Sequence, residues 1–215
     1  MTRARWMTFP VLAMALALPV AAQEPAKEVK AAPKAGAKPV GKPAAPNQEE
    51  MMKAWMAYMT PGEPHAHFAK LAGSWTTKTK SWMDPAKPPE ETTGSCEFRM
   101  VLGGRYLEQR FEGSMMGQPY SGIGFTGYDN VKKKYEAFWI DSAGTGMMIM
   151  TGSPDPAGKK TVFTGSMLDP MTGRKVAMKA IDTEVDADNL LFEMWMSGPD
   201  GKMAKSMEMA YTRKK

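Results

Sequence analysis

The stretch that decides the fold spans residues 103–141 and reads GGRYLEQRFEGSMMGQPYSGIGFTGYDNVKKKYEAFWID. It holds three runs of aromatic and aliphatic residues between glycine-rich breaks, at residues 106–111, 120–128 and 135–140. Runs of this length, bounded by Gly, Pro, Asn and Asp, are typical of strands joined by tight turns. The stretch therefore predicts three consecutive strands of an antiparallel β-meander.

The same alternation of strands and turns continues on both sides of this stretch. Turn residues such as Pro199-Asp200-Gly201 separate the runs. A spacing of about 8–12 residues indicates a sandwich or a barrel, and the absence of any long crossover favours an up-and-down barrel. We expect an all-β fold, an antiparallel barrel of about ten strands that forms one domain over residues 47–215. The expected strands lie near residues 74–83, 92–101, 105–114, 119–128, 134–141, 146–152, 160–168, 174–182, 189–197 and 202–212.

One or two short helices are predicted before the barrel. Asn47 and Glu50 form the pattern of a capping box for a helix over residues 47–59. A second short helix is predicted from Pro64, with Phe68 pointing inward. The apolar residues of the first helix fall on one broad face, which we expect to lie on the body of the domain: Met51, Met52, Trp55, Met56 and Met59.

Some of the predicted strands alternate apolar and charged residues. Cys96, Phe98 and Met100 alternate with Glu97 and Arg99, and the sequence leaves open which set faces the interior. Cys96 is the single cysteine of the chain, so no intramolecular disulfide can form. We expect a buried, inert thiol.

Residues 1–22 have the pattern of a signal peptide. Arg3 and Arg5 precede a short apolar core at residues 11–18, and small residues precede an expected cleavage site before Gln23. The alternative is a retained membrane anchor, but the apolar core is too short to span a bilayer. We therefore expect a periplasmic or secreted protein without a stable membrane anchor.

Residues 23–46 consist mainly of Ala, Pro and Lys, which favours a disordered linker. The chain has a formal charge of +5, and residues 1–48 hold seven Lys and Arg against two Glu, so the folded domain is neutral. A nucleic-acid-binding domain would carry its own basic excess. We expect no nucleic acid as a partner, although the linker lysines could touch anionic lipid or cell wall.

A resemblance to known families rests on motifs along residues 50–215. The opening HAHFAKLAGSW, from His65 to Trp75, resembles the helix and Gly-x-Trp entry of lipocalin-like (calycin) barrels. The later series resembles a bacterial family of exported proteins, a domain of unknown function: Gly103-Gly104-Arg105, Gly122, Gly127-Tyr128-Asp129, Trp139-x-Asp141-Ser142, Thr145, Gly152 and Tyr211-x-Arg213. The resemblance implies a closed barrel related to fatty-acid-binding barrels and haem-binding nitrobindin. It also implies that Trp75 plugs one end of the barrel.

The sequence predicts no cofactor. The haem-binding relatives use a histidine near the last strand, and residues 203–212 contain none. His65 and His67 are weak candidates for half of a metal site, but we favour a role in capping the short helix or the closed end of the barrel. The 22 methionines could bind Cu(I), but an adaptable apolar filling explains them better.

A ligand-binding site is predicted at one mouth of the barrel. Arg105, Tyr128, Trp139, Asp141 and Thr145 would form a polar recognition rim there, although several of them could equally serve only in turns. No Ser-His-Asp set or paired-acid spacing supports catalysis. The favoured function is a binding module for a small apolar or amphipathic molecule. Two alternatives stay open. One is a structural or interaction protein with a filled barrel, for which a homodimer is one form of assembly, and the other is an enzyme acting on a lipophilic substrate.

The expected leader makes one prediction. Because a signal peptidase cuts after small residues, the exported protein should begin at Gln23, and its intact mass should correspond to residues 23–215. A mass that includes residues 1–22 would contradict the expected localisation.

Overall fold

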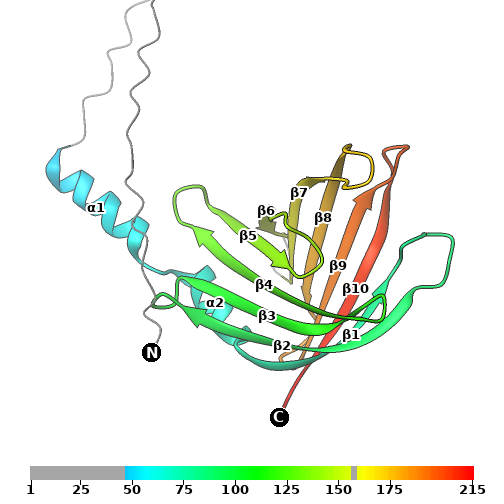
Figure 1. Ribbon diagram of the computed structural model, residues 1–215. Coiled ribbons are helices and arrows are strands. Elements are labelled where there is room, and N and C mark those ends of the chain that lie inside the picture. The colour runs from blue at the N-terminus through cyan, green and yellow to red at the C-terminus, as the bar shows by residue number, and fades with distance from the viewer. Residues whose placement is uncertain (1–46, 156–158) are drawn as a thin grey trace, which may run out of the picture. The chain divides into compact units, whose positions relative to one another are not determined.

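The computed structural model describes residues 47–155 and 159–215, so the predicted leader and linker lie outside the described residues. The described residues form two helices and ten strands (Figure 1). Their bounds are α1 Gln48–Met59, α2 Glu63–Leu71, β1 Gly73–Ser81, β2 Glu90–Val101, β3 Tyr106–Met115, β4 Gln118–Asp129, β5 Lys134–Asp141, β6 Met148–Pro154, β7 Lys160–Leu168, β8 Lys175–Glu184, β9 Asn189–Ser197 and β10 Met203–Arg213.

The strands form the closed antiparallel barrel that the sequence predicts. Each strand pairs with its neighbours in the chain, and β1 pairs with β10 to close the ring. Trp75 of β1, for example, lies opposite Cys96 of β2 on one side and opposite Arg213 of β10 on the other. Consecutive hairpins therefore account for the whole topology, as an up-and-down barrel requires.

The structure settles which face of the alternating strands points inward. Cys96 and Phe111 are buried in the interior with Trp75, so Arg99, Glu108 and Arg110 face outward. Glu108 is nevertheless only 4% exposed, because Arg99 Nε and Arg110 Nη2 donate to its carboxylate at 2.9 and 2.7 Å. The hydrogen bond from Arg99 holds the pKa of Glu108 below its usual range.

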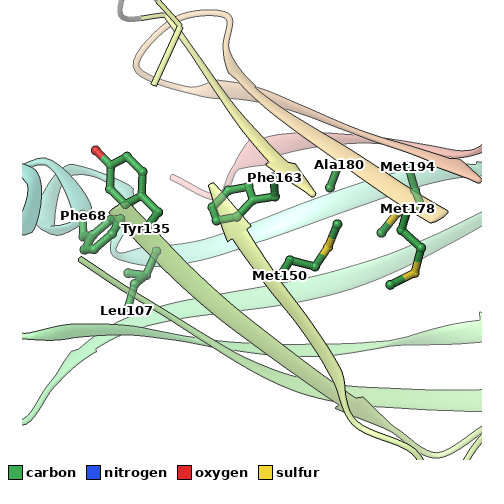
Figure 2. Close-up of a cluster of buried hydrophobic side chains, with 8 residues drawn as sticks. All are labelled: Phe68, Leu107, Tyr135, Met150, Phe163, Met178, Ala180 and Met194. Atoms are coloured by element: carbon green, nitrogen blue, oxygen red, sulfur yellow. The ribbon is translucent and has the colours of Figure 1, made fainter. Parts of the chain in front are cut away.

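The interior side chains form two adjoining apolar clusters. One contains Trp75, Cys96, Phe111, Met209 and Tyr211. The other, shown in Figure 2, extends from α2 over the inner faces of β3 and of β5 to β9, which we call the far wall. Its residues are Phe68, Leu107, Tyr135, Met150, Phe163, Met178, Ala180 and Met194. Both clusters come from residues two apart along their strands, which is the spacing that puts side chains on one face of a sheet.

Helix α1 has the predicted capping box, but its predicted position is wrong. The Asn47 side chain accepts from the Glu50 amide and the Glu50 side chain accepts from the Asn47 amide. No residue of α1 is buried, and Trp55 at the centre of the apolar face is 57% exposed. The apolar pattern predicted burial, yet this face lacks a covering surface among the described residues.

The end of α1, rather than its face, is attached to the barrel. Asn130 in the β4–β5 turn donates from Nδ2 to three carbonyl oxygens at this end, 2.9–3.2 Å away. Arg105 in the β2–β3 turn donates to the Met59 carbonyl at 2.8 Å. The last carbonyls of a helix lack partners within it, so these two side chains stabilise the end of α1.

Helix α2 closes one end of the barrel, which we call the α2 end. The His65 ring packs edge-on against Tyr128 of β4, with 6.0 Å between ring centroids, while His67 forms an ion pair with Glu184 of β8. Because β4 and β8 lie on different sides of the barrel, α2 spans the opening of the barrel. Phe68, 5% exposed, points into the interior as predicted.

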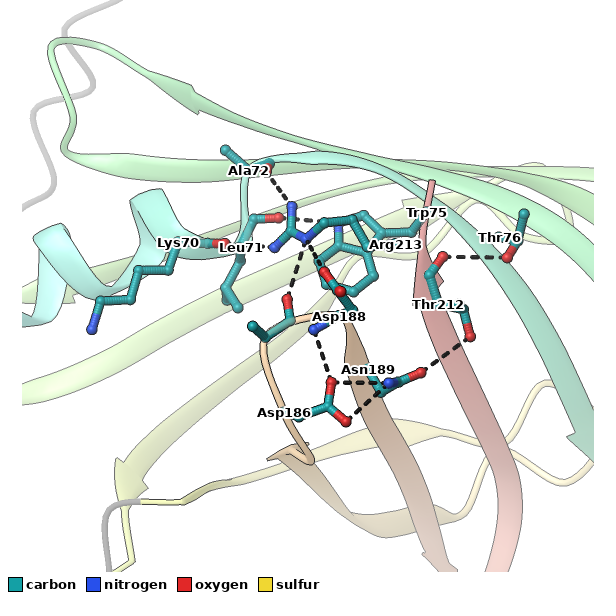
Figure 3. Close-up of polar contacts among 11 residues, drawn as sticks. Lys70, Leu71, Ala72, Trp75, Thr76, Asp186, Asp188, Asn189, Thr212 and Arg213 are labelled. Carbon is teal, nitrogen blue, oxygen red and sulfur yellow. Dashed lines mark hydrogen bonds and ion pairs between the residues drawn. The ribbon is translucent and has the colours of Figure 1, made fainter. Parts of the chain in front are cut away.

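Trp75 and Arg213 join the first strand, the last strand and α2 at this end (Figure 3). Trp75 is fully buried, its Nε1 donates to the Leu71 carbonyl at 3.1 Å, and the Arg213 guanidinium lies 4.1 Å from its ring centroid. Arg213 also donates to the carbonyls of Lys70 and Ala72, at 2.7 and 2.8 Å. Gly73 is needed here, because its φ of +131° is a conformation that residues with a Cβ rarely adopt.

The closure at the α2 end generates a stability prediction. Trp75→Ala should lower the free energy of unfolding by about 3–5 kcal/mol, because it removes a buried indole and leaves a cavity. Trp55→Ala is the matched control, and its exposed position on α1 should limit the loss to about 0.5 kcal/mol. Urea denaturation measures both variants, and an equal loss in the two would contradict the role of Trp75.

Candidate functional site

Several side chains that face the interior of the barrel are not fully buried. Phe98, Trp139 and Phe192 point inward from three different strands, beside residues of the two buried clusters, yet each remains partly accessible. Side chains that face inward in a closed ring keep this accessibility only where space remains in front of them. The interior is therefore the candidate binding site.

Methionine is the main lining of this space. Eight methionines lie in or against the apolar cluster of the far wall: Met100, Met148, Met150, Met167, Met178, Met194, Met196 and Met207. Met209 lies in the adjoining cluster. The thioether side chain is flexible and polarisable, so it adapts to ligands of different shape. The lining thus suits an apolar molecule without fixing its outline.

A polar cluster interrupts this lining near the α2 end. Gln109 of β3 donates from Nε2 to the Tyr211 hydroxyl of β10 at 3.2 Å, across the interior. Burial raises the pKa of Tyr211 above its usual value and raises the pKa of the neighbouring Cys96 thiol to about 12. Cys96 is therefore the buried, unreactive thiol that the sequence predicts.

Asp182 of β8 is the carboxylate on this part of the inner wall. It shares its face with buried Ala180 and Met178, and it lies opposite Thr161 of β7 and Phe192 of β9. Its side chain is accessible from the interior space, and within residues 47–155 and 159–215 no side chain or amide forms a hydrogen bond or ion pair with it. Enclosure by the wall, and then the charge of Glu184, raise the pKa of Asp182 to about 7.

Two hydroxyl groups on the opposite part of the wall are also unpartnered. Thr77 and Thr79 of β1 are only 2% and 6% exposed, and the Oγ1 atom of each lacks a hydrogen-bond partner among the described residues. Cross-strand neighbours connect Thr79 to Asp182. The row runs over β1, β10, β9 and β8 and consists of Thr79, Met209, Phe192 and Asp182. Polar groups thus stand at both ends of one apolar row that crosses four strands.

At the end opposite α2, Trp139 is held by two hydrogen bonds. Its Nε1 lies 3.0 Å from Asp141 Oδ2 and 3.2 Å from the Tyr120 hydroxyl. The indole lies flat on β4, where a Cβ at Gly122 would approach to 2.1 Å from the ring. The absence of a side chain at Gly122 therefore leaves room for the Trp139 indole. Burial raises the pKa of Tyr120 to about 12, so its hydroxyl keeps its proton at neutral pH.

A depression of about 370 Å³ adjoins this rim on the outside. It is lined by Met115, Met116, Gln118, Pro119, Tyr120, Ser142 and Ala143. Tyr120 borders both the depression and the Trp139 cluster. The Trp139 hydrogen bonds therefore lie beside a mainly apolar depression of the surface.

The five residues predicted to form one rim lie at two ends of the barrel. Trp139 and Asp141 lie together, and Thr145 follows them in the exposed loop before β6. Tyr128 packs against His65 at the α2 end, where Arg105 holds α1. The two groups separate because β4 and β5 are antiparallel, so neighbours at one end of the pair are distant from those at the other. A ligand-binding role for each remains a prediction.

Sequence reasoning missed the polar groups inside the barrel. Asp182 follows Met178 and Ala180 at alternate positions, so an acidic residue on an apolar face was the available signal. Thr77 carries a similar signal, because it alternates with the buried Trp75. The hydrogen bond between Gln109 and Tyr211 had no such signal, because it joins strands that are distant in sequence.

Both histidines take part in closing the α2 end. His65 Nδ1 accepts from the Gly62 amide at 3.0 Å, and burial lowers the pKa of His65. His67 pairs with Glu184. In the described part of the chain, the structure contains no group of three or more His, Cys, Asp and Glu residues placed to hold a metal ion. Neither described helix has the length and hydropathy to cross a bilayer.

The rim position of Trp139 predicts a variant that folds. Trp139→Ala should cost less stability than Trp75→Ala, because its indole is partly accessible while that of Trp75 is fully buried. It should also weaken uptake of an uncharged apolar fluorescent probe. Trp139→Phe, which keeps a ring over Gly122, is the control and should retain more uptake. Loss of folding in Trp139→Ala would show that the ring supports the fold instead.

Comparison with known proteins places the fold and the family. The solved structure of Rv2717c from M. tuberculosis is similar, with a TM-score of 0.52 and 18% identity over 72% of this chain and 100% of that chain. The S-type phycobiliprotein lyase CPES from Guillardia theta aligns with a TM-score of 0.49 and 12% identity, over 79% of this chain and 99% of that chain. At 18% identity, the likeness to Rv2717c concerns the fold. None of the curated proteins matches.

The sequence itself matches one family profile. The match covers residues 60–213, which include α2 and all ten strands of the barrel, and the family is described as "Protein of unknown function (DUF1579)". The match confirms the expected family of unknown function. The chain belongs to the DUF1579 family.

Proposed function

We propose that this protein is a binding module that holds a small apolar or amphipathic molecule inside its barrel. The observation that carries the proposal is the inner wall, on which the inward-facing Phe98, Trp139 and Phe192 stay partly accessible. Ligand sites are mostly apolar and contain a few placed polar groups. The methionine lining and the polar groups near Tyr211 match that description.

The unpartnered polar groups add a second line of support. Leaving a buried hydroxyl without a hydrogen bond costs free energy. Thr77 and Thr79 both carry such hydroxyls on the inner wall. The protein's own atoms cover both hydroxyls, so their support is limited to showing that the inner wall is not uniformly apolar.

We further propose that binding takes place in the periplasm or outside the cell. The proposal rests on residues 1–22, which have the charged start, apolar core and small-residue end of an export signal. An exported carrier has no access to cytosolic energy sources, and binding alone requires none.

An interaction protein is the competing function, and one observation favours it. The apolar face of α1 is exposed, and beside it lies a groove of about 570 Å³ lined by Glu50, Met51, Ala54, Trp55, Tyr58 and Val131. An enzyme is less well supported: His65 and His67 both have structural partners, so neither stands ready as a base.

Filling the interior separates these functions. Ala137 of β5 faces inward between Thr126 and Met150 and is partly accessible, so Ala137→Phe should occupy the space in front of it. We expect N-phenyl-1-naphthylamine, an uncharged fluorescent probe, to bind the unsubstituted protein and to bind Ala137→Phe at least about tenfold more weakly.

The matched control places the same ring outside. Ala210 of β10 is exposed on the outer face, so Ala210→Phe should leave probe binding unchanged. Circular dichroism checks that both variants fold. If the probe binds Ala137→Phe as tightly as the unsubstituted protein, or is lost on Trp55→Ala instead, binding takes place outside the barrel.

A further inference from the structure

The unpartnered carboxylate on the inner wall specifies the chemistry of the ligand. Resting on the proposed function, we propose that the ligand is a cationic amphiphile, an apolar body with a protonated primary or secondary amine, and that Asp182 binds the ammonium group inside the barrel. The apolar body would lie along the methionine lining. The inference goes beyond the proposed function, which leaves the charge of the ligand open.

Asp182 lies on the inner wall of the barrel. Its pairing with Thr161 and Phe192 places it on the same face as buried Ala180 and Phe163. Its carboxylate is accessible only from the interior side of this closed wall and forms no hydrogen bond or ion pair with any described residue. Its side chain is more than a third exposed, so a ligand inside the barrel can reach the carboxylate without displacing a protein partner.

The lysines of this wall point away from Asp182. Lys179 of β8 and Lys205 of β10 lie over the Trp195 ring on the outer face, 5.3 and 5.5 Å from its centroid. Lys205 is further held by Glu193 and Glu208. Neither lysine can neutralise a carboxylate on the opposite face of the sheet.

The remaining charged groups near Asp182 also leave it without a counter-ion. Glu184 faces the same side, and its charge disfavours the ionised form of Asp182. His67 already pairs with Glu184, and Arg213 is held by Asp188 and by backbone carbonyls. The described interior is therefore locally negative, which favours a cation over an anion as the ligand.

Aromatic and apolar side chains lie beside the carboxylate. Phe192 lies directly beside Asp182, and Met209 lies beside Phe192. An ammonium group at Asp182 can contact an aromatic face as well as the carboxylate, and both contacts favour a cation. Three strand spacings farther along this row, roughly 14 Å along the wall, lies Thr79, whose hydroxyl is covered by the protein, so Asp182 is the polar group of this row that a ligand can reach.

The raised pKa of Asp182, about 7, agrees with this reading. The empty site holds a proton on part of the molecules near neutral pH and so avoids much of the cost of an isolated charge. A bound ammonium group would favour the ionised carboxylate and lower that pKa. Glu184 is the charged group that faces Asp182 and influences this titration, while Asp182 in turn helps to raise the pKa of the nearby Tyr211.

Three probes of equal chain length test the proposal: decylamine, decan-1-ol and decanoate, each below its micellar concentration. Each displaces N-phenyl-1-naphthylamine from the protein at about pH 8, where Asp182 is ionised and decylamine is protonated. We expect decylamine to bind at least about tenfold more tightly than the alcohol, because a charge-assisted hydrogen bond to a carboxylate is stronger than a neutral one. Decanoate should bind most weakly.

Asp182→Asn and Glu193→Gln form a matched pair of variants. Both remove one negative charge from the same wall, Asp182 on the inner face and Glu193 on the outer face. We expect the amine preference to disappear in Asp182→Asn and to persist in Glu193→Gln, while decan-1-ol binds all three proteins alike. Because decan-1-ol binding needs no charge, it also reports that each variant is folded and hollow.

The outcomes separate the two proposals. Equal binding of the three probes, or an amine preference that survives Asp182→Asn, would overturn the cationic ligand while leaving the hollow barrel in place. Failure of every probe to bind the unsubstituted protein would overturn the proposed function itself, and the cationic ligand with it.

Discussion

The contact between Arg213 and Trp75 joins the last strand of the barrel to the first. The guanidinium lies 4.1 Å from the indole centroid, and the two residues belong to the last and the first strand. Because Arg213 also donates to the carbonyls of Lys70 and Ala72, α2 is fixed to the same point. The pairing of β1 with β10 over seven residue pairs closes the barrel, and the Trp75–Arg213 cluster fixes α2 at one end of this pairing.

Closure at one end stabilises the barrel without requiring a fully packed interior. The α2 end is packed by Phe68 and Trp75, so the middle and the opposite end need not be filled to stabilise the fold. The inner wall can then carry groups that cost stability, such as the Thr79 hydroxyl and the Asp182 carboxylate. Unfavourable groups of this kind collect at functional sites and are offset by packing elsewhere.

The sequence predicted the strands and their order because both depend on local patterns. Turn residues and two-residue alternation located all ten strands, and the Asn47–Glu50 pair located α1. Two features depended on longer-range geometry and were not predicted. The apolar face of α1 cannot reveal whether a surface lies against it, and here none does among the described residues. The rim residues around Trp139 and Tyr128 looked alike in sequence, but antiparallel pairing puts them at different ends.

We propose that the barrel interior holds a small molecule, which the protein acquires in the periplasm or outside the cell. Native mass spectrometry of protein purified from its own host, compared with the same sample after denaturation, measures this most directly. The account predicts a native mass above that of the polypeptide by a small-molecule increment, and release of that molecule on unfolding. A native mass equal to that of the polypeptide alone, in repeated preparations, would contradict it.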